Sequence, residues 1–156
     1  GYLWDEGEPK KAFEKAIKEA NKVAMSLSDL FCVERHKTHF LDLVKNKLDI
    51  TFANEQEIMS LINAKDIKTV INFAKELKKL IIVTRGEKGA VAINKEEIVE
   101  CVARENLKIK DLTGAGDLFA AGFLHGYVNG KSLKESLDIG TEMSSKVIQI
   151  IGARIN

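Results

Sequence analysis

The sequence predicts a three-layer α/β/α domain with a mostly parallel sheet and an antiparallel edge. First, strand-like runs alternate with segments of helical apolar spacing along the whole chain of 156 residues. Second, the run at 80–84 is apolar throughout, which is typical of a strand buried on both faces of a parallel sheet. Third, two strand-like runs at 90–93 and 98–103 follow closely spaced glycines, which indicates an antiparallel pair.

The first half of the chain begins the alternation. We expect a helix over residues 9–25, a short strand leading into a loop over 25–31, a helix over 33–46, a strand over 49–53 and a helix over 55–63. Pro9 falls in the first turn of the first helix, where its missing N–H is tolerated. Asn54 follows the strand at 49–53 and can cap the helix after it.

The second half continues the same pattern. We expect a helix over residues 66–77, a central strand over 80–84, the antiparallel runs at 90–93 and 98–103, a helix from near Leu118 to Val128 and a last helix over 133–151. Asp66 and Ser132 are suitable N-caps for two of these helices. Gly140 is a potential break in the last one.

Composition limits the class of protein. A chain that is 45% hydrophobic and 30% charged, with one proline, is expected to form a single α/β domain over residues 1–156. Its formal net charge of +1 gives no case for nucleic acid or a membrane surface, so we expect small-molecule partners. No apolar run approaches a membrane span and the first residues are no signal peptide, which favours a cytoplasmic location. Cys32 and Cys101 are interpreted as free thiols.

The segment Asp111-Leu112-Thr113-Gly114-Ala115-Gly116-Asp117 carries the strongest chemical signal. The small residues leave the N–H groups of residues 114–117 able to converge on an anion at the start of the next helix. Asp117 would repel a phosphate unless it takes a proton from an attacking hydroxyl, so phosphoryl transfer is predicted. The alternative is a closely packed loop in which Asp117 only favours the helix dipole.

This segment, followed by Leu-Phe-Ala-Ala-Gly-Phe, resembles the C-terminal signature Asp-Thr-x-Gly-Ala-Gly-Asp of the ribokinase (PfkB-type) carbohydrate kinase family. The resemblance implies a ribokinase-like fold and ATP-dependent transfer of a phosphoryl group to the hydroxymethyl group of a nucleoside or sugar. It implies that Asp117 is the general base and that the amides of Gly114, Ala115 and Gly116 form an anion hole. Asp111 and Thr113 match positions near a monovalent-cation (K+) site in some members, while Leu112 replaces the usual Thr and leaves cation use open.

Two further motifs match the family in the same order. Thr84-Arg85-Gly86-Glu87-Lys88-Gly89 is similar to its Thr-x-Gly-x-x-Gly segment, which implies that Thr84, Gly86 and Gly89 contact the nucleotide. Asn54 and Glu57 are similar to its Asn-x-x-Glu motif, which implies a role in nucleotide binding, with Glu57 acting on Mg2+ through water. The alternatives are an ordinary turn for the first segment and a capping Asn with a solvated Glu for the second.

The resemblance extends along the chain and points to one branch. The segments Gly1-Tyr2-Leu3-Trp4-Asp5, Ser26-Leu27-Ser28-Asp29, Phe31-Cys32-Val33 and Ile151-Gly152-Ala153-Arg154 look like bacterial adenosine kinases. The chain covers only the C-terminal half of such a protein, and residues 1–3 are expected to end a strand. The lid and most acceptor-binding residues would lie outside it, as would the lid strands through which relatives form homodimers.

Several rival functions stay open at this stage. Within the family the acceptor can be another sugar, as in ribokinase or fructokinase. The chain can also be a nucleotide-binding fragment without catalysis. A dehydrogenase is disfavoured, since no Gly-x-Gly-x-x-Gly follows the first strand. Cys32, His36 and His39 have spacings that could place three zinc ligands on one helical face, although ordinary surface histidines explain them better.

Overall fold

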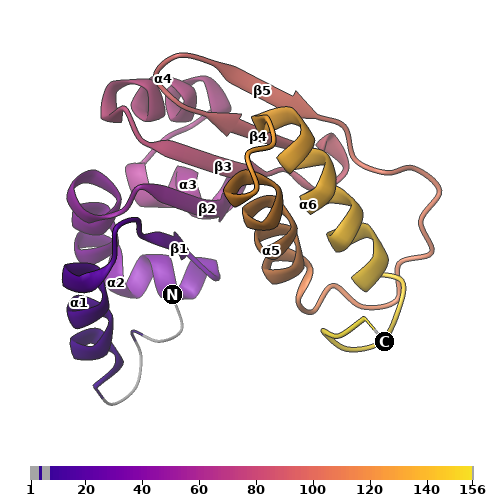
Figure 1. Cartoon of the computed structure of the whole chain (residues 1–156), viewed down its shortest axis with the longest axis horizontal. Coiled ribbons are helices and arrows are strands. Elements are labelled where there is room, and N and C mark those ends of the chain that lie inside the picture. The colour runs from indigo at the N-terminus through magenta and orange to yellow at the C-terminus, as the bar shows by residue number, and fades with distance from the viewer. Residues whose placement is uncertain (1–3, 5–7, 156) are drawn as a thin grey trace. The chain divides into compact units, whose positions relative to one another are not determined.

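The computed structural model describes Trp4 and residues 8–155 (Figure 1). The elements in chain order are α1 (Pro9–Glu19), β1 (Ala24–Ser26), α2 (Leu30–Asp42), a π-helical turn (Leu43–Lys47), β2 (Ile50–Asn54), α3 (Glu55–Ile62), α4 (Ile67–Leu77), β3 (Leu80–Thr84), a 3-10 turn (Gly86–Lys88), β4 (Ala90–Ile93), β5 (Ile98–Cys101), α5 (Ala115–Val128) and α6 (Leu133–Val147).

The strands form one mixed sheet in the order β1-β2-β3-β4-β5. Strands β1 and β2 are parallel, with Met25 opposite Thr51. Two helices connect β2 to β3, which is the crossover that a parallel pair requires. The connections from β3 to β4 and from β4 to β5 are too short for a crossover, so these pairs are antiparallel. The predicted α/β class, with parallel strands and an antiparallel edge, is confirmed.

The chain divides into two compact units. The first comprises Gly1–Ile82 and Ile93–Glu97, and the second comprises Val83–Ala92 and Ile98–Asn156. The core of the first unit includes the fully buried side chains of Leu27, Val33, Phe40, Val44, Leu48, Ile58, Leu61, Ile81, Ile82 and Ile93. In the second unit, apolar side chains of α5 and α6 are buried together, among them Phe119, Phe123, Leu137 and Val147.

Helix starts follow the predicted capping residues. Asn54 begins α3 and Ser132 begins α6, each through a capping box in which a glutamate three residues later bonds back to the cap. Asp66 begins α4 by accepting the N–H of Thr69 at 2.7 Å. Each cap satisfies helix N–H groups that have no partner within the helix, which explains why these positions could be predicted from local sequence.

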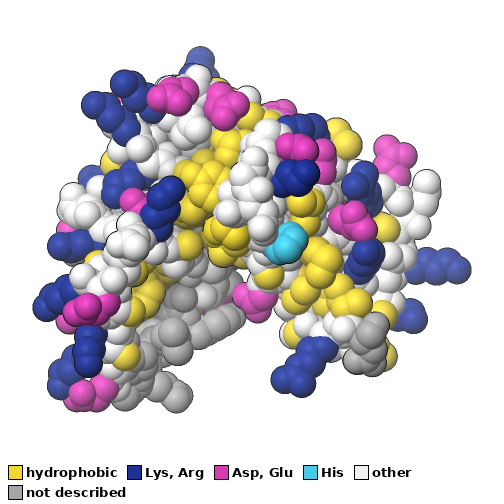
Figure 2. All heavy atoms as spheres, viewed as in Figure 1, with side chains coloured by type: hydrophobic (Ala, Val, Ile, Leu, Met, Phe, Trp, Pro, Cys, Tyr) yellow, Lys and Arg dark blue, Asp and Glu magenta, His cyan; other side chains and the backbone are white. Residues whose placement is uncertain are grey.

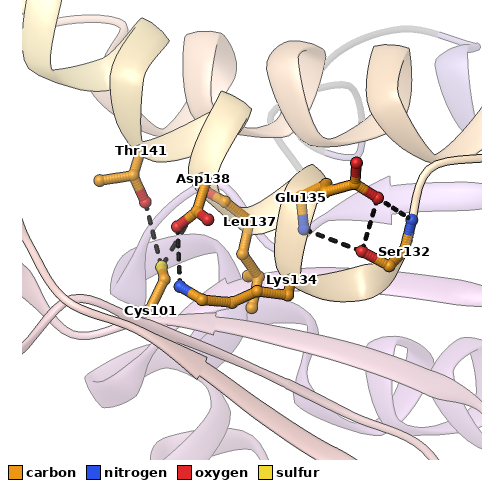
Figure 3. A network of polar contacts seen from close by, with 7 residues as sticks. All are labelled: Cys101, Ser132, Lys134, Glu135, Leu137, Asp138 and Thr141. Carbon is orange, nitrogen blue, oxygen red and sulfur yellow. Dashed lines mark hydrogen bonds and ion pairs between the residues drawn. The ribbon is translucent and has the colours of Figure 1, made fainter.

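Helix α6 lies against the last strand of the second unit, β5 (Figure 3). The Sγ of Cys101 is 3.1 Å from the Oγ1 of Thr141. On the exposed side of the same helix, Lys134 pairs with Asp138 at 2.8 Å. Cys101 and Cys32 are both buried and neither is in a disulfide, as predicted.

The predicted first helix is too long at its C-terminal end. It ends at Glu19, and Ala20 already has an extended backbone. The carbonyl of Val23 accepts N–H groups from Asp49 and Ile50, which draws the following residues into the sheet. Pairing with a strand distant in sequence therefore overrides the apolar spacing that suggested a helix as far as residue 25.

The predicted bounds also change around the glycine segment. Helix α5 begins at Ala115 rather than near Leu118, so Gly116 and Asp117 belong to its first turn. Helix α6 ends at Val147 rather than at residue 151, and Gly140 lies inside it without a break. The carbonyl of Ile148 accepts the N–H groups of Lys110 and Asp111. This tertiary contact ends the helix, and no local sequence pattern indicates it.

Helix α2 starts at Leu30, three residues before its predicted start at residue 33. Asp29 caps it by accepting the N–H of Cys32 at 2.7 Å, and this cap was overlooked in the sequence. The helix is kinked at His36, and the segment predicted as helical as far as residue 46 finishes as a wide π-helical turn.

Charged side chains of both signs are interspersed over the face of the molecule seen in Figure 2. This mixture agrees with the nearly balanced composition of 24 basic and 23 acidic residues. Among the described residues, no helix combines the length and apolar character needed to cross a membrane.

Candidate functional site

The glycine segment forms a tight turn into α5. Gly114 caps the helix with φ of 78°, a left-handed conformation that favours glycine. The N–H of Ala115 donates to the carbonyl of Leu112 at 3.2 Å, and the N–H of Leu118 donates to that of Gly114 at 2.9 Å. The N–H groups of Gly116 and Asp117 lie between these bonds, at positions that have no carbonyl to reach within a helix. An anion at this helix start would meet those two amides first.

Asp117 is the third residue of α5 and its side chain is exposed. A carboxylate in the first turn is favoured by the helix dipole, and exposure leaves it accessible to a substrate. Both readings of the sequence therefore suit this position. The predicted role of general base stays a prediction.

A second segment, absent from the predicted site, holds the glycine turn in place. Asp111 Oδ2 accepts the N–H of Gly152 at 2.9 Å, and Asp111 Oδ1 accepts the N–H of Thr113 at 2.9 Å. A Cβ placed on Gly114 would come within 2.6 Å of the Cβ of Ala153. The turn after α6 thus contacts the glycine turn through both a polar bond and close packing.

The predicted K+ ligands lie in this contact. The N–H of Thr113, the N–H of Gly152 and the Thr113 hydroxyl hold the pKa of Asp111 below its usual value. These donors already occupy much of the acceptor capacity of the carboxylate. Leu112, between the two predicted ligands, is exposed and offers no side-chain oxygen. The K+ site stays a prediction.

The Thr84–Gly89 segment is a second glycine turn of the same unit. The N–H of Arg85 donates to the carbonyl of Gly89 at 2.8 Å. Gly89 has φ of 82°, and a Cβ there would lie 1.9 Å from the carbonyl oxygen of Cys101, so only glycine fits. Gly86 also has a positive φ of 59°, yet a Cβ would meet nothing within 4 Å. Packing therefore explains Gly89, while at Gly86 only the backbone conformation favours glycine.

Asn54 and Glu57 belong to the first unit and bond to each other. Glu57 Oε2 accepts the N–H of Asn54 at 2.8 Å, and Glu57 Oε1 accepts its Nδ2 at 2.6 Å. Asn54 Oδ1 in turn accepts the N–H of Glu57 at 2.9 Å. The alternative of a capping Asn is thus realised. The solvated Glu of that alternative is wrong, because Glu57 is only 4% exposed.

The buried carboxylate of Glu57 has a second carboxylate nearby. Burial raises its pKa above the ordinary 4.5, hydrogen bonding from the Asn54 N–H opposes this, and the charge of Asp29 adds to the rise. Asp29 follows β1 and Glu57 follows β2, and the ends of parallel neighbours meet at one sheet edge. A cation bound at this edge would offset the cost of burying the charged carboxylate and would reduce the repulsion between the two like charges.

The raised pKa of Glu57 predicts a pH-dependent stability. A group with a raised folded pKa contributes stability that is present below its unfolded value and lost as pH rises through its folded value. We expect the free energy of unfolding of the native protein, minus that of Glu57→Gln, to fall from pH 4.5 towards neutrality. Urea denaturation without Mg2+ or nucleotide measures this difference. Glu76→Gln on α4 controls for general loss of one charge, and a difference that rises with pH would contradict the assignment.

Among the described residues, no group of three or more His, Cys, Asp or Glu side chains is placed to hold a metal ion. Cys32, His36 and His39 therefore do not form the three-ligand set considered for zinc. Cys32 is buried at 1% exposure, and the backbone is kinked at His36, which disrupts the helical spacing that the zinc hypothesis assumed. Mg2+ does not need such a set, since one or two carboxylates with water and phosphate suffice for it.

The predicted residues are divided between the two units. Asn54 and Glu57 are a feature of the first unit, whereas Thr84, Gly86, Gly89 and residues 111–117 belong to the second. Sequence reasoning missed the parts taken by Asp29 and by residues 152–153. The position of Asp29 just before an apolar helix was a usable signal for a cap. The contact between Asp111 and Gly152 spans 41 residues, and no local pattern encodes it.

Comparisons with known proteins match nearly the whole chain. The sequence model that describes the pfkB family of carbohydrate kinases matches residues 7–156 of this chain. A cytidine kinase from Thermococcus kodakarensis is 34% identical over 119 residues, which cover 68% of this chain and 39% of that protein.

Two solved structures superpose closely. An adenosine kinase from Sinorhizobium meliloti has a TM-score of 0.94 and 40% identity, and the match covers 99% of this chain and 49% of that one. A probable sugar kinase from Rhizobium etli has a TM-score of 0.92 and 39% identity, with 98% and 48% covered. The chain spans about half the length of these two structures and less of the cytidine kinase.

Proposed function

Because this chain belongs to the pfkB family of carbohydrate kinases, we propose that it is the C-terminal, nucleotide-binding and catalytic half of an ATP-dependent kinase. The reaction transfers the γ-phosphoryl group of ATP to the hydroxymethyl group of a nucleoside. Adenosine is the first candidate, because an adenosine kinase is 40% identical over nearly the whole chain. Residues 1–156 then act as one α/β domain of the larger enzyme.

The observation that carries the proposal is the start of α5. Gly114 turns the chain, Gly116 and Asp117 present N–H groups, and the Asp117 carboxylate is exposed in the same turn. Amides at a helix start stabilise charge on a transferred phosphoryl group. A carboxylate beside them can accept the proton of the attacking hydroxyl. In this proposal Asp117 is the base, and the amides of Gly114, Ala115 and Gly116 line the anion hole with that of Asp117. The N–H of Ala115 would have to leave the carbonyl of Leu112 to take part.

The other predicted residues take supporting parts. Thr84, Gly86 and Gly89 contact the nucleotide through the turn after β3. Glu57, oriented by Asn54, would hold Mg2+ through water. The donor set fits this ion, because Glu57 and the nearby Asp29 are hard oxygen ligands whose like charges a divalent cation would relieve. Bound Mg2+ would neutralise charge on the phosphates of ATP.

K+ at Asp111 and Thr113 has less support, because the carboxylate of Asp111 already accepts two backbone N–H groups. Replacing K+ by tetramethylammonium at constant ionic strength tests it, and an unchanged rate would remove K+ from the proposal. The cytoplasmic location and a homodimer formed through a lid outside this chain are further parts of the proposal. Cell fractionation and light scattering of the encoded protein test these two parts.

The direct test is an assay of the protein expressed from its own initiator methionine. ATP-dependent phosphorylation is measured with adenosine, cytidine, ribose and fructose as acceptors. Turnover of adenosine above the others is the expected result. Turnover of a free sugar alone would keep the kinase and replace the acceptor. Binding of Mg-ATP without phosphorylation of any acceptor would favour a nucleotide-binding module.

A sugar kinase of the ribokinase or fructokinase type is the second candidate. It is favoured by the probable sugar kinase from Rhizobium etli, whose identity of 39% is nearly that of the adenosine kinase. The two candidates share the phosphate-binding residues and differ only in acceptor. The acceptor panel therefore separates them without any change to the roles proposed for α5.

A further inference from the structure

The bond between Asp111 and Gly152 joins the glycine turn to the segment that follows α6. The carbonyl of Ile148 strengthens this junction by accepting the N–H groups of Lys110 at 2.8 Å and of Asp111 at 3.3 Å. The turn that leads into α5 is thereby held on both the backbone and the side chain of Asp111. Charge-assisted bonds from a carboxylate to backbone N–H groups are stronger than neutral ones.

The same junction is closely packed. Ala153 lies where a Cβ on Gly114 would be, with its Cβ 2.6 Å and its Cα 3.0 Å from that position. Gly114 is the cap of α5, two residues before Gly116 and three before Asp117, whose N–H groups point from the helix start. A small displacement of residues 152–153 would therefore change the direction of those amides.

We propose that Asp111 is a positioning residue whose carboxylate clamps the glycine turn to Gly152 and so aims the amides of Gly116 and Asp117 at the nucleotide phosphates. This inference rests on the proposed kinase function for its consequence, but the clamp itself is a property of the second unit. Asp111 touches neither the phosphate nor the acceptor in this arrangement. It acts through the backbone of residues 113–117.

The variant Asp111→Asn separates the two bonds of the carboxylate. Its remaining oxygen can still accept the N–H of Thr113 and keep the local turn. Its amide nitrogen is a donor and cannot accept the N–H of Gly152. Asp66→Asn is the matched control, because Asp66 makes the same kind of bonds to the N–H and hydroxyl of Thr69 in the other unit.

The first readout is hydrogen exchange followed by mass spectrometry on the encoded protein without nucleotide. We expect the peptide over residues 111–118 to exchange about tenfold faster in Asp111→Asn than in the native protein. A change of this size corresponds to the free energy of one lost charge-assisted hydrogen bond. Asp66→Asn leaves that peptide unchanged. Equal exchange in Asp111→Asn and the native protein would overturn the clamp, whatever the enzyme does.

The second readout is kinetic. In Asp111→Asn the KM for ATP rises about tenfold while the KM for the acceptor stays unchanged, since only the phosphate-binding amides are misaligned. A general loss of stability would not separate the two KM values. Faster exchange with an unchanged KM for ATP would overturn the positioning role. If the native protein phosphorylates no acceptor, the proposed function fails, and the exchange experiment alone decides whether the clamp exists.

Discussion

Replacing Asp117 by Asn is expected to lower kcat by about 10²–10⁴-fold, the usual contribution of a positioned general base. The amide is nearly the same size as the carboxylate but cannot take a proton from the acceptor hydroxyl. The loss of a favourable first-turn charge on α5 costs only about 0.3–1 kcal/mol of stability, which is too little to explain such a fall. Steady-state phosphorylation of the best acceptor measures the effect, and Mg-ATP binding should persist.

The matched control for this experiment is Asp138→Asn. Asp138 is a half-exposed carboxylate on α6 of the same unit, paired with Lys134 and not with any predicted site residue (Figure 3). It undergoes the same chemical change, so its turnover should equal that of the native protein. Full turnover in Asp117→Asn would remove Asp117 as the base and leave phosphate binding as the only role of this helix start.

The second large effect is expected at Gly140, where α5 and α6 approach each other through glycines. A Cβ at Gly140 would lie 2.7 Å from the carbonyl oxygen of Phe119, and one at Gly122 would lie 3.0 Å from the Cα of Gly140. In Gly140→Ala, overpacking against a backbone atom costs about 1–3 kcal/mol. Higher helix propensity returns about 1 kcal/mol, so we expect net destabilisation of up to about 2 kcal/mol.

Urea denaturation measures this loss of stability, with Gly116→Ala as the control. Gly116 is also helical, but a Cβ there meets nothing within 4 Å, so that variant should be as stable as the native protein or slightly more so. Because Gly140 packs on Phe119, two residues after Asp117, Gly140→Ala should also reduce kcat/KM. If Gly140→Ala were more stable than the native protein, the close approach of the two helices would be disproved.

The parts of the fold that were predicted correctly are those set by local interactions. Asn54, Asp66 and Ser132 cap helices through side chains three residues from their partners, so a short window contains both members of each bond. The buried run at 80–84 became β3 without change. Two of the errors lie at helix ends decided by distant partners, as where Val23 pairs with Asp49 and Ile50. The wrong start of α2 has a local cause, the overlooked cap at Asp29.

The candidate site divides in the same way. The order of small residues and carboxylates in residues 111–117 is local, and it alone indicated an anion-binding helix start and its family. Whether Glu57 is solvated could not be read from its motif. A solvated Glu was one of the two readings of the motif, whereas packing leaves the side chain 4% exposed beside Asp29. Burial depends on which elements come together, and a motif of four residues does not contain that information.

By itself the sequence determined the α/β class, the capped helices, the glycine turns and the family resemblance, because each depends on residues close together in the chain. Only the tertiary structure decided that α6 ends at Val147, where Ile148 bonds to Lys110 and Asp111, and that Asp111 bonds to Gly152, 41 residues away. It also decided that Gly140 does not interrupt α6 but allows that helix to pack closely on α5. The physical reason is that hydrogen bonds and steric contacts between distant segments leave no periodic trace in either segment.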